Sequence, residues 1–197
     1  MQQITISLNS LFSLIPFCSK DKNRYILTGV KVSDIKTNKK FYRVYEATDG
    51  VKLARIYKPI EKIELTDCII LKTDDLKKIK TKNDIVYCDI DKSKHRVEIE
   101  NTIIEDLDGV YVNTEAVLVY TIEIPEKFTK NDKFFYIRGS NIEIIERFFN
   151  DNEKINSKTD FINLNQIMTN QYIKEGTKIL GYFDTKNYKQ VVVMPII

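Results

Sequence analysis

The stretch of sequence that decides the fold runs from Asn23 to Ile60 and reads NRYILTGVKVSDIKTNKKFYRVYEATDGVKLARIYKPI. Segments rich in β-branched and aromatic residues are predicted to be strands, at 25–31, 41–47 and 51–57. The Thr48-Asp49-Gly50 tripeptide predicts a turn before the last of them, because glycine adopts positive φ without steric cost. The stretch therefore predicts a strand, a polar connection and a hairpin.

The segment before this stretch has the pattern of an amphipathic helix. Between Ser7 and Cys18 the apolar residues recur at helical spacing, at Leu8, Leu11, Phe12 and Ile15. Ser7 is suited to the N-cap, and Pro16 is expected to end or kink the helix because proline has no amide hydrogen to donate.

A second unit with the same order of elements follows. It begins with a strand at 67–71 and a short helix capped by Thr73, whose buried stripe is Leu76 and Ile79. Further strands are predicted at 84–91 and 95–101, then a turn at Asp108-Gly109 and a buried strand at 116–124 that ends at Pro125. The chain thus repeats its pattern at a period of about 60–65 residues.

A third unit completes the chain. A strand is predicted from Lys133 (KFFYIRG), and a capping box at Ser140 to Glu143 starts a helix. Later strands are predicted at 161–168, 177–184 and 190–197. The expected fold class is α+β. The expected organisation is a domain over residues 1–125, made of units 1–60 and 61–125, followed by a third unit or reduced second domain over 126–197.

The composition is that of an ordinary globular protein. Among 197 residues, 43% are hydrophobic and 30% are charged, so a packed core is expected. The net charge of +3 neither predicts nor excludes binding to DNA. Because the three cysteines form no CxxC pair, reduced thiols in a cytoplasm are expected. We find neither a signal-peptide pattern nor an apolar run long enough to cross a membrane, so no membrane partner is predicted.

Catalytic motifs are missing from the sequence. It contains no phosphate-binding glycine loop, no HExxH and no GxSxG. Acidic pairs such as Asp74/Asp75 and Asp89/Asp91 leave open a metal-dependent nuclease, but helix first turns and solvated strand faces explain them more simply. We therefore predict no catalytic residues, no metal site and no cofactor.

Three patches of the sequence resemble one family, the bacterial DNA polymerase III β subunit, or β sliding clamp. The first patch is RYILTGV followed by EATDGVKLARI, in residues 24–56. The second contains DCIILKTDDLKKIK, DLDGVY and IEIP, and the third is VVVMPII at 191–197. The resemblance implies the DNA-clamp fold, with antiparallel sheets outside and helices lining a central hole. It implies a replication processivity factor that encircles double-stranded DNA without sequence specificity.

The resemblance also implies particular site residues and partners. A groove for peptides of DNA polymerase and clamp loader would be formed by Leu27, Thr48, Gly50, Val51, Lys52, Leu53, Pro125, Val192, Met194 and Pro195. DNA would be contacted by Lys20, Lys22, Arg24, Tyr25, Lys77 and Lys78. The alternative interpretation is that the groove residues are simply core and the lysines are solvated surface.

The chain departs from the family pattern in several ways. The family's first domain is absent, Val51-Lys52 stands in place of its His-Arg pair, and the third helix, NIEIIERFFNDNEK, is mainly acidic. About twelve strand–helix units close a family ring, so about three units per chain would need about four copies, whereas three copies would suffice if the last 75 or so residues held a reduced full domain. A second hypothesis keeps the fold and groove but not the ring, as an adaptor or inhibitor. The abundance of Lys, Ile and Asn is typical of an AT-rich genome, such as that of a phage or mobile element.

Overall fold

The computed structural model describes residues 2–118, 121, 123–124, 126–130, 139–149, 171–175, 177 and 179–194. In these parts the order strand, helix, three strands occurs three times. The first run is β1 (Gln2–Ser7), α1 (Leu8–Leu14), β2 (Gly29–Thr37), β3 (Lys40–Thr48) and β4 (Lys52–Ile60). The second is β5 (Ile69–Lys72), α2 (Thr73–Leu76), β6 (Ile85–Asp91), β7 (Arg96–Ile99) and β8 (Thr102–Glu105). The third is β9 (Phe128–Lys130), α3 (Gly139–Phe149), β10 (Gln171–Lys174), β11 (Leu180–Asp184) and β12 (Lys189–Val193).

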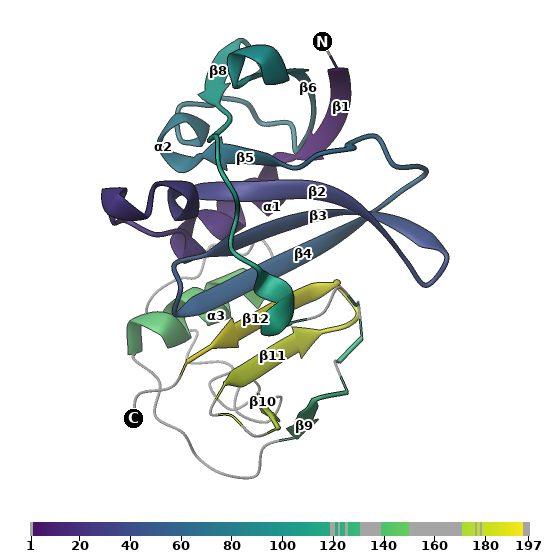
Figure 1. Ribbon diagram of the computed structural model, residues 1–197, viewed down its shortest axis with the longest axis vertical. Helices are drawn as coiled ribbons and strands as arrows, with labels where there is room; N and C mark the ends of the chain where they lie inside the picture. The colour runs from purple at the N-terminus through teal and green to yellow at the C-terminus, as the bar shows by residue number, and fades with distance from the viewer. Residues whose placement is uncertain are drawn as a thin grey trace.

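The strands of the described residues form two antiparallel sheets. The smaller has the order β1-β6-β7-β8 and the larger has the order β5-β2-β3-β4-β12-β11-β10-β9. The first two runs exchange their first strands, since β1 pairs with β6 and β5 pairs with β2. In the third run β9 pairs with β10 of its own run. Strands β4 and β12 pair and thereby join the first and third runs into one sheet (Figure 1).

Helix α1 forms where the sequence predicts it, and its ends have local causes. The Ser7 hydroxyl accepts a hydrogen bond from the amide of Ser10, as an N-cap does. Leu8, Leu11 and Leu14 are buried against the sheets. Pro16 lies in a short 3-10 helix, Ile15–Phe17, which ends the helical segment.

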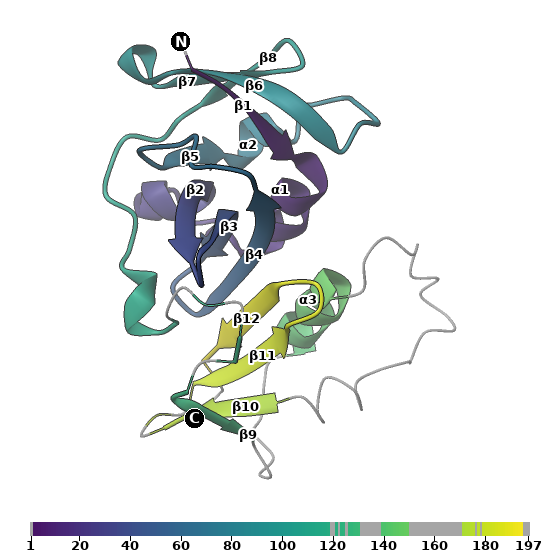
Figure 2. The same ribbon diagram turned by 90° about the vertical axis from the view of Figure 1, so that its right-hand side faces the viewer.

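The two faces of the larger sheet are covered differently. Helices α1 and α3 lie on one face, and the segment after β8 crosses the other (Figure 2). Because both faces are covered, β3 is buried throughout Tyr42–Thr48 and β4 throughout Lys52–Tyr57. The 3-10 helix after α1 meets α3 through an edge-to-face contact between Phe17 and Phe148, whose ring centroids are 5.1 Å apart.

Several predicted strands are wrong. Residues 25–28 belong to a 3-10 helix, Lys22–Thr28, because the Asp21 carboxylate accepts the amide of Asn23 and starts a helical turn there. Residues 114–116 form another 3-10 helix, so the apolar run at 116–118 packs on the sheet instead of joining it. The strand predicted at 95–101 ends at Ile99, because Glu100 and Asn101 have positive φ and form the turn to β8. Most of the predicted strands at 133–139 and 161–168 lie outside the described residues.

Candidate functional site

A groove lies over the seam between β4 and β12, on the sheet face opposite the helices. Its cavity measures about 240 Å³. Three segments line it, namely the turn between β3 and β4, the segment after β8, and the strands β11 and β12 with their flanks. The lining residues are Thr48, Gly50, Val51, Lys52, Leu53, Val112, Asn113, Thr114, Val117, Ile179, Val192, Val193 and Met194.

The floor of the groove is set by strand register. Leu53 on β4 lies opposite Thr48 on β3 and opposite Val192 on β12, so the three side chains share one row on this face. Leu53 and Val192 are buried and pack with Leu118 and Phe128. The floor is therefore apolar and built from two different runs of the chain.

The turn that forms one wall is fixed by side chains of the turn itself. The Asp49 carboxylate accepts hydrogen bonds from the amides of Val51 and Lys52, both at 2.9 Å. The Thr48 hydroxyl donates to the carbonyl of Lys52 at 2.7 Å. Gly50 has φ of +89°, a backbone conformation that favours glycine, and an added Cβ there would lie 2.9 Å from the Arg24 guanidinium, which would have to move.

The C-terminal end of β12 is tied to the same turn. The amide of Met194 donates to the carbonyl of Val51 at 2.9 Å. Met194 is 54% exposed and Val51 48%, so these two side chains form an apolar rim above the buried floor. An unbranched methionine at such a rim can adapt to ligands of different shape.

The opposite wall is the segment 106–118, which we call the strap. Its start is fixed to β5, because the Asp106 carboxylate accepts the amide of Ile70 at 2.8 Å and the amide of Leu107 donates to the carbonyl of Ile70. Its end carries the 3-10 helix Thr114–Ala116, capped by the Asn113 side chain. The strap thus crosses the outer face of β2, β3 and β4 before it reaches the groove (Figure 1).

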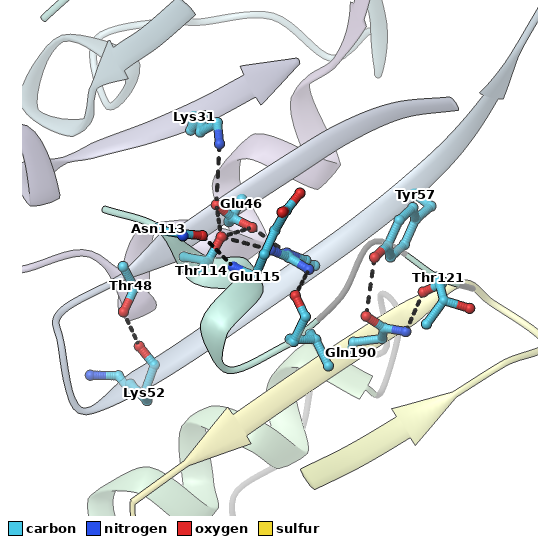
Figure 3. A network of polar contacts seen from close by, with 12 residues as sticks. Lys31, Glu46, Thr48, Lys52, Tyr57, Asn113, Thr114, Glu115, Thr121 and Gln190 are labelled. Atoms are coloured by element: carbon cyan, nitrogen blue, oxygen red, sulfur yellow. Dashed lines mark hydrogen bonds and ion pairs between the residues drawn. The ribbon is translucent and has the colours of Figure 1, made fainter. Parts of the chain in front are cut away.

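Beneath the strap, four polar side chains lie directly opposite one another on adjacent strands, and we call them the polar row. They are Lys31 on β2, Glu46 on β3, Arg55 on β4 and Gln190 on β12. Arg55 and Glu46 are fully buried and form an ion pair. Lys31 Nζ lies 3.6 Å from the Glu46 carboxylate. Figure 3 labels Lys31, Glu46 and Gln190 of this row together with the strap residues Asn113, Thr114 and Glu115.

The structure brings most of the predicted groove residues together. Those that line the cavity are Thr48, Gly50, Val51, Lys52, Leu53, Val192 and Met194. Leu27 is placed elsewhere, in a cluster with Ile70, Leu107 and Tyr111. Pro125 and Pro195 lie outside the described residues. Sequence reasoning missed the strap residues of the lining, Val112, Asn113, Thr114 and Val117, since a segment that covers a sheet without pairing has no periodicity to reveal it.

The residues predicted to contact DNA fall into two groups. Lys20, Lys22, Arg24 and Tyr25 are exposed around the 3-10 helix at 22–28. Arg24 donates to the carbonyl of Asp49 at 2.7 Å, so its guanidinium braces the groove turn. The Tyr25 hydroxyl binds Glu105, and this hydrogen bond raises the pKa of Tyr25.

The second predicted group follows helix α2. Lys77 and Lys78 are exposed, and each ammonium pairs with an aspartate of the helix, Asp74 at 3.1 Å and Asp75 at 2.6 Å. The acidic pair therefore serves the helix end and its lysines. Within the described residues, no three His, Cys, Asp or Glu side chains gather as a metal would require.

The contribution of the Asp49 carboxylate to the stability of the protein should depend on pH in the acid range. Partial burial alone would raise the pKa of Asp49, but hydrogen bonds from the Lys52 ammonium and from the amides of Lys52 and Val51 outweigh it, and the pKa falls below its ordinary 3.8. The stability that Asp49 contributes is therefore present above pH 3.8 and lost as the pH falls below it. Denaturant unfolding of wild type and Asp49→Asn should converge at low pH; a constant difference would contradict this linkage.

Comparison with known proteins gives the fold. No family model matches the chain, and no curated protein does. Solved structures of bacterial DNA polymerase III β subunits do match, with TM-scores of 0.64 for Thermotoga maritima at 14% identity and 0.64 for Caulobacter crescentus at 12%. The Bartonella birtlesii sliding clamp, bound to griselimycin, gives 0.63 at 11%.

These matches cover 100%, 99% and 100% of this chain, but 66%, 65% and 66% of the clamps. The protein therefore has the sliding-clamp fold and spans about two thirds of the length of those clamps, which confirms the predicted fold class. None of the helices in the described residues is long and apolar enough to cross a membrane.

Proposed function

We propose that the protein is a DNA sliding clamp, a replication processivity factor that encircles duplex DNA and tethers a DNA polymerase and other partners through the groove. The observation that carries the proposal is the position of the groove. Segments distant in sequence converge on a small apolar cavity over the seam of two runs, in a chain with the clamp fold. A cavity of about 240 Å³ is smaller than typical sites for whole small molecules and suits side chains of a short peptide.

The tether would work without catalysis. A ring threaded by DNA keeps a bound polymerase at high effective concentration near its template, so processivity needs no reactive group. We propose accordingly that the protein is not an enzyme and uses no metal or cofactor. We also propose that it acts in the cytoplasm, where replication takes place in bacteria.

The ring would be a homo-oligomer. We keep the division into residues 1–125, with units 1–60 and 61–125, and a third unit over 126–197. Three runs per chain and about twelve per ring favour four copies, and three would suffice if residues 126–197 were a reduced full domain. The edge strands β8 and β9 of the two sheets are candidates for pairing between copies, which would hide sheet edges that otherwise invite aggregation.

Contacts with DNA would be weak and independent of sequence, as sliding requires. Lys20, Lys22, Arg24 and Tyr25 offer cations and an aromatic ring for phosphate contact and stacking. Lys77 and Lys78 would contribute less, because Asp74 and Asp75 neutralise them in part.

Topology on DNA tests the ring directly. Protein loaded on nicked circular plasmid should stay bound through gel filtration at moderate salt, and cutting the plasmid once should release it, because a ring slides off free ends. Native mass spectrometry at micromolar concentration should show a trimer or tetramer. Equal retention on circular and linear DNA, or a monomer at every concentration, would overturn the ring; a monomer that still binds peptide would instead identify an adaptor.

A further inference from the structure

We propose that the polar row positions the strap as a wall of the groove, so that buried side chains outside the cavity set its affinity for an apolar peptide. Glu46 and Arg55 do not line the cavity, and we assign them as positioning residues. The inference rests on the proposed function, since it concerns the same groove.

The polar row lies one step from the groove floor. Glu46 and Thr48 are two residues apart on β3, so their side chains point to the same face of the sheet. The same holds for Leu53 and Arg55 on β4. Gln190 and Val192 are likewise two residues apart on β12 and share this face. A segment held over the polar row is therefore held at the edge of the floor.

Arg55 fastens the strap at two points. Its Nη2 donates to the Thr114 hydroxyl at 2.6 Å, and its Nη1 donates to the carbonyl of Leu118 at 2.7 Å. The Thr114 hydroxyl in turn donates to Glu46, whose two carboxylate oxygens both lie 3.0 Å away. Thr114 lines the cavity and is itself buried, so this one residue connects the polar row to the groove wall (Figure 3).

Gln190 holds the residues that follow the strap in the sequence, also through backbone carbonyls. Its amide donates to the carbonyls of Thr121 at 2.5 Å and Glu123 at 3.2 Å. The Tyr57 hydroxyl donates to the Gln190 amide oxygen at 3.2 Å, which fixes the orientation of the amide (Figure 3). The polar row therefore binds backbone carbonyls at several points over the seam between β4 and β12.

These bonds fix the strap in a way that apolar packing would not. Hydrophobic contact is non-directional, so a strap held by packing alone could shift along the sheet at little cost. A shift here would break the hydrogen bonds from Arg55 to Thr114 and Leu118 and from Thr114 to Glu46, and the loss of hydrogen bonds to buried charged groups is costly. Because Val112, Asn113 and Val117 sit on the strap, its register determines the width of the groove.

The test replaces Arg55 by lysine, which keeps a positive charge beside Glu46 but cannot reach Thr114 and Leu118 with one planar fork. The probe is a fluorescein-labelled peptide with adjacent leucine and phenylalanine, measured by anisotropy. Arg55→Lys should weaken binding about tenfold or more and should speed hydrogen exchange of amides 112–118. Arg147→Lys is the matched control, because Arg147 forms an exposed pair with Glu143 on α3, and it should change neither quantity.

A second pair of variants covers the case in which Arg55→Lys does not fold. Thr114→Val keeps the shape but removes the hydroxyl, and should reproduce both effects, whereas Thr114→Ser keeps the hydroxyl and should restore both. Wild-type affinity in a folded Arg55→Lys or Thr114→Val protein would overturn the inference, as would unchanged exchange of the strap amides. Failure of the wild type itself to bind the peptide would instead count against the proposed groove.

Discussion

Replacing Met194 by aspartate should weaken binding of an apolar peptide at least tenfold. The side chain sits at the rim of the cavity and is 54% exposed, so a carboxylate there would face the peptide without entering the core. Bringing an apolar ligand against it would desolvate an unpaired charge, a cost of the kind that dominates interface hot spots. Fluorescence anisotropy with the leucine–phenylalanine peptide measures the loss, and thermal unfolding should be almost unchanged.

The matched control is Val110→Asp. Val110 is 93% exposed on the strap and does not line the cavity, so the same charge in the same segment should leave affinity at the wild-type level. Equal affinity of Met194→Asp and wild type for the peptide would remove Met194 from the groove.

Replacing Asp34 by alanine should give a large loss of stability, about 3 kcal/mol, because it removes the buried two-oxygen partner of Arg43 and leaves the guanidinium with Glu64, 2.8 Å away, as its carboxylate partner. The Asp34 carboxylate binds Arg43 through two oxygens, at 2.8 and 2.9 Å, and both side chains are almost completely buried. The same carboxylate accepts the amides of Glu64 and Leu65. Arg43 also donates to the carbonyl of Thr5 on β1, so the pair links the two sheets.

Urea unfolding measures this loss, and two comparisons sharpen it. Asp74→Ala removes an exposed partner of Lys77 and should cost less than about 1 kcal/mol. The double variant Asp34→Leu/Arg43→Met removes both buried charges, leaves Glu64 at a site where its side chain is partly exposed to water, and should be more stable than Asp34→Ala. If Asp34→Ala costs no more than Asp74→Ala, Asp34 and Arg43 do not hold the sheets together.

The sequence predicts most accurately those elements whose ends are fixed by side chains close by in the chain. The serine cap and Pro16 locate helix α1, and the Thr48-Asp49-Gly50 turn is found because its side chains bind its own backbone. The turn and the strand positions beside it supply five of the thirteen residues that line the groove, so motif resemblance and local physics agree there. These features depend on neighbours in the chain and are therefore visible in a single sequence.

Features that depend on distant parts of the chain escape the same reasoning. Nothing local shows that β1 pairs with β6 or that β5 pairs with β2. Glu46 and Arg55 read as ordinary alternating polar residues of a hairpin, and only their cover by Thr114 and Leu118 makes them buried anchors. Leu27 was assigned to the groove by motif position, whereas the 3-10 helix before β2 turns it towards Leu107 and Tyr111.

The exchange of first strands between the first two runs has a consequence for synthesis on the ribosome. Strand β1 is translated before its partner β6, which begins at Ile85, so β1 must wait unpaired while the intervening chain is translated. Such long-range pairing slows folding and exposes nascent strands to misassociation. The third run finds its pairing partner within itself, so it can close as soon as its own strands are complete. We therefore expect chaperone dependence to arise from the segment that holds the first two runs.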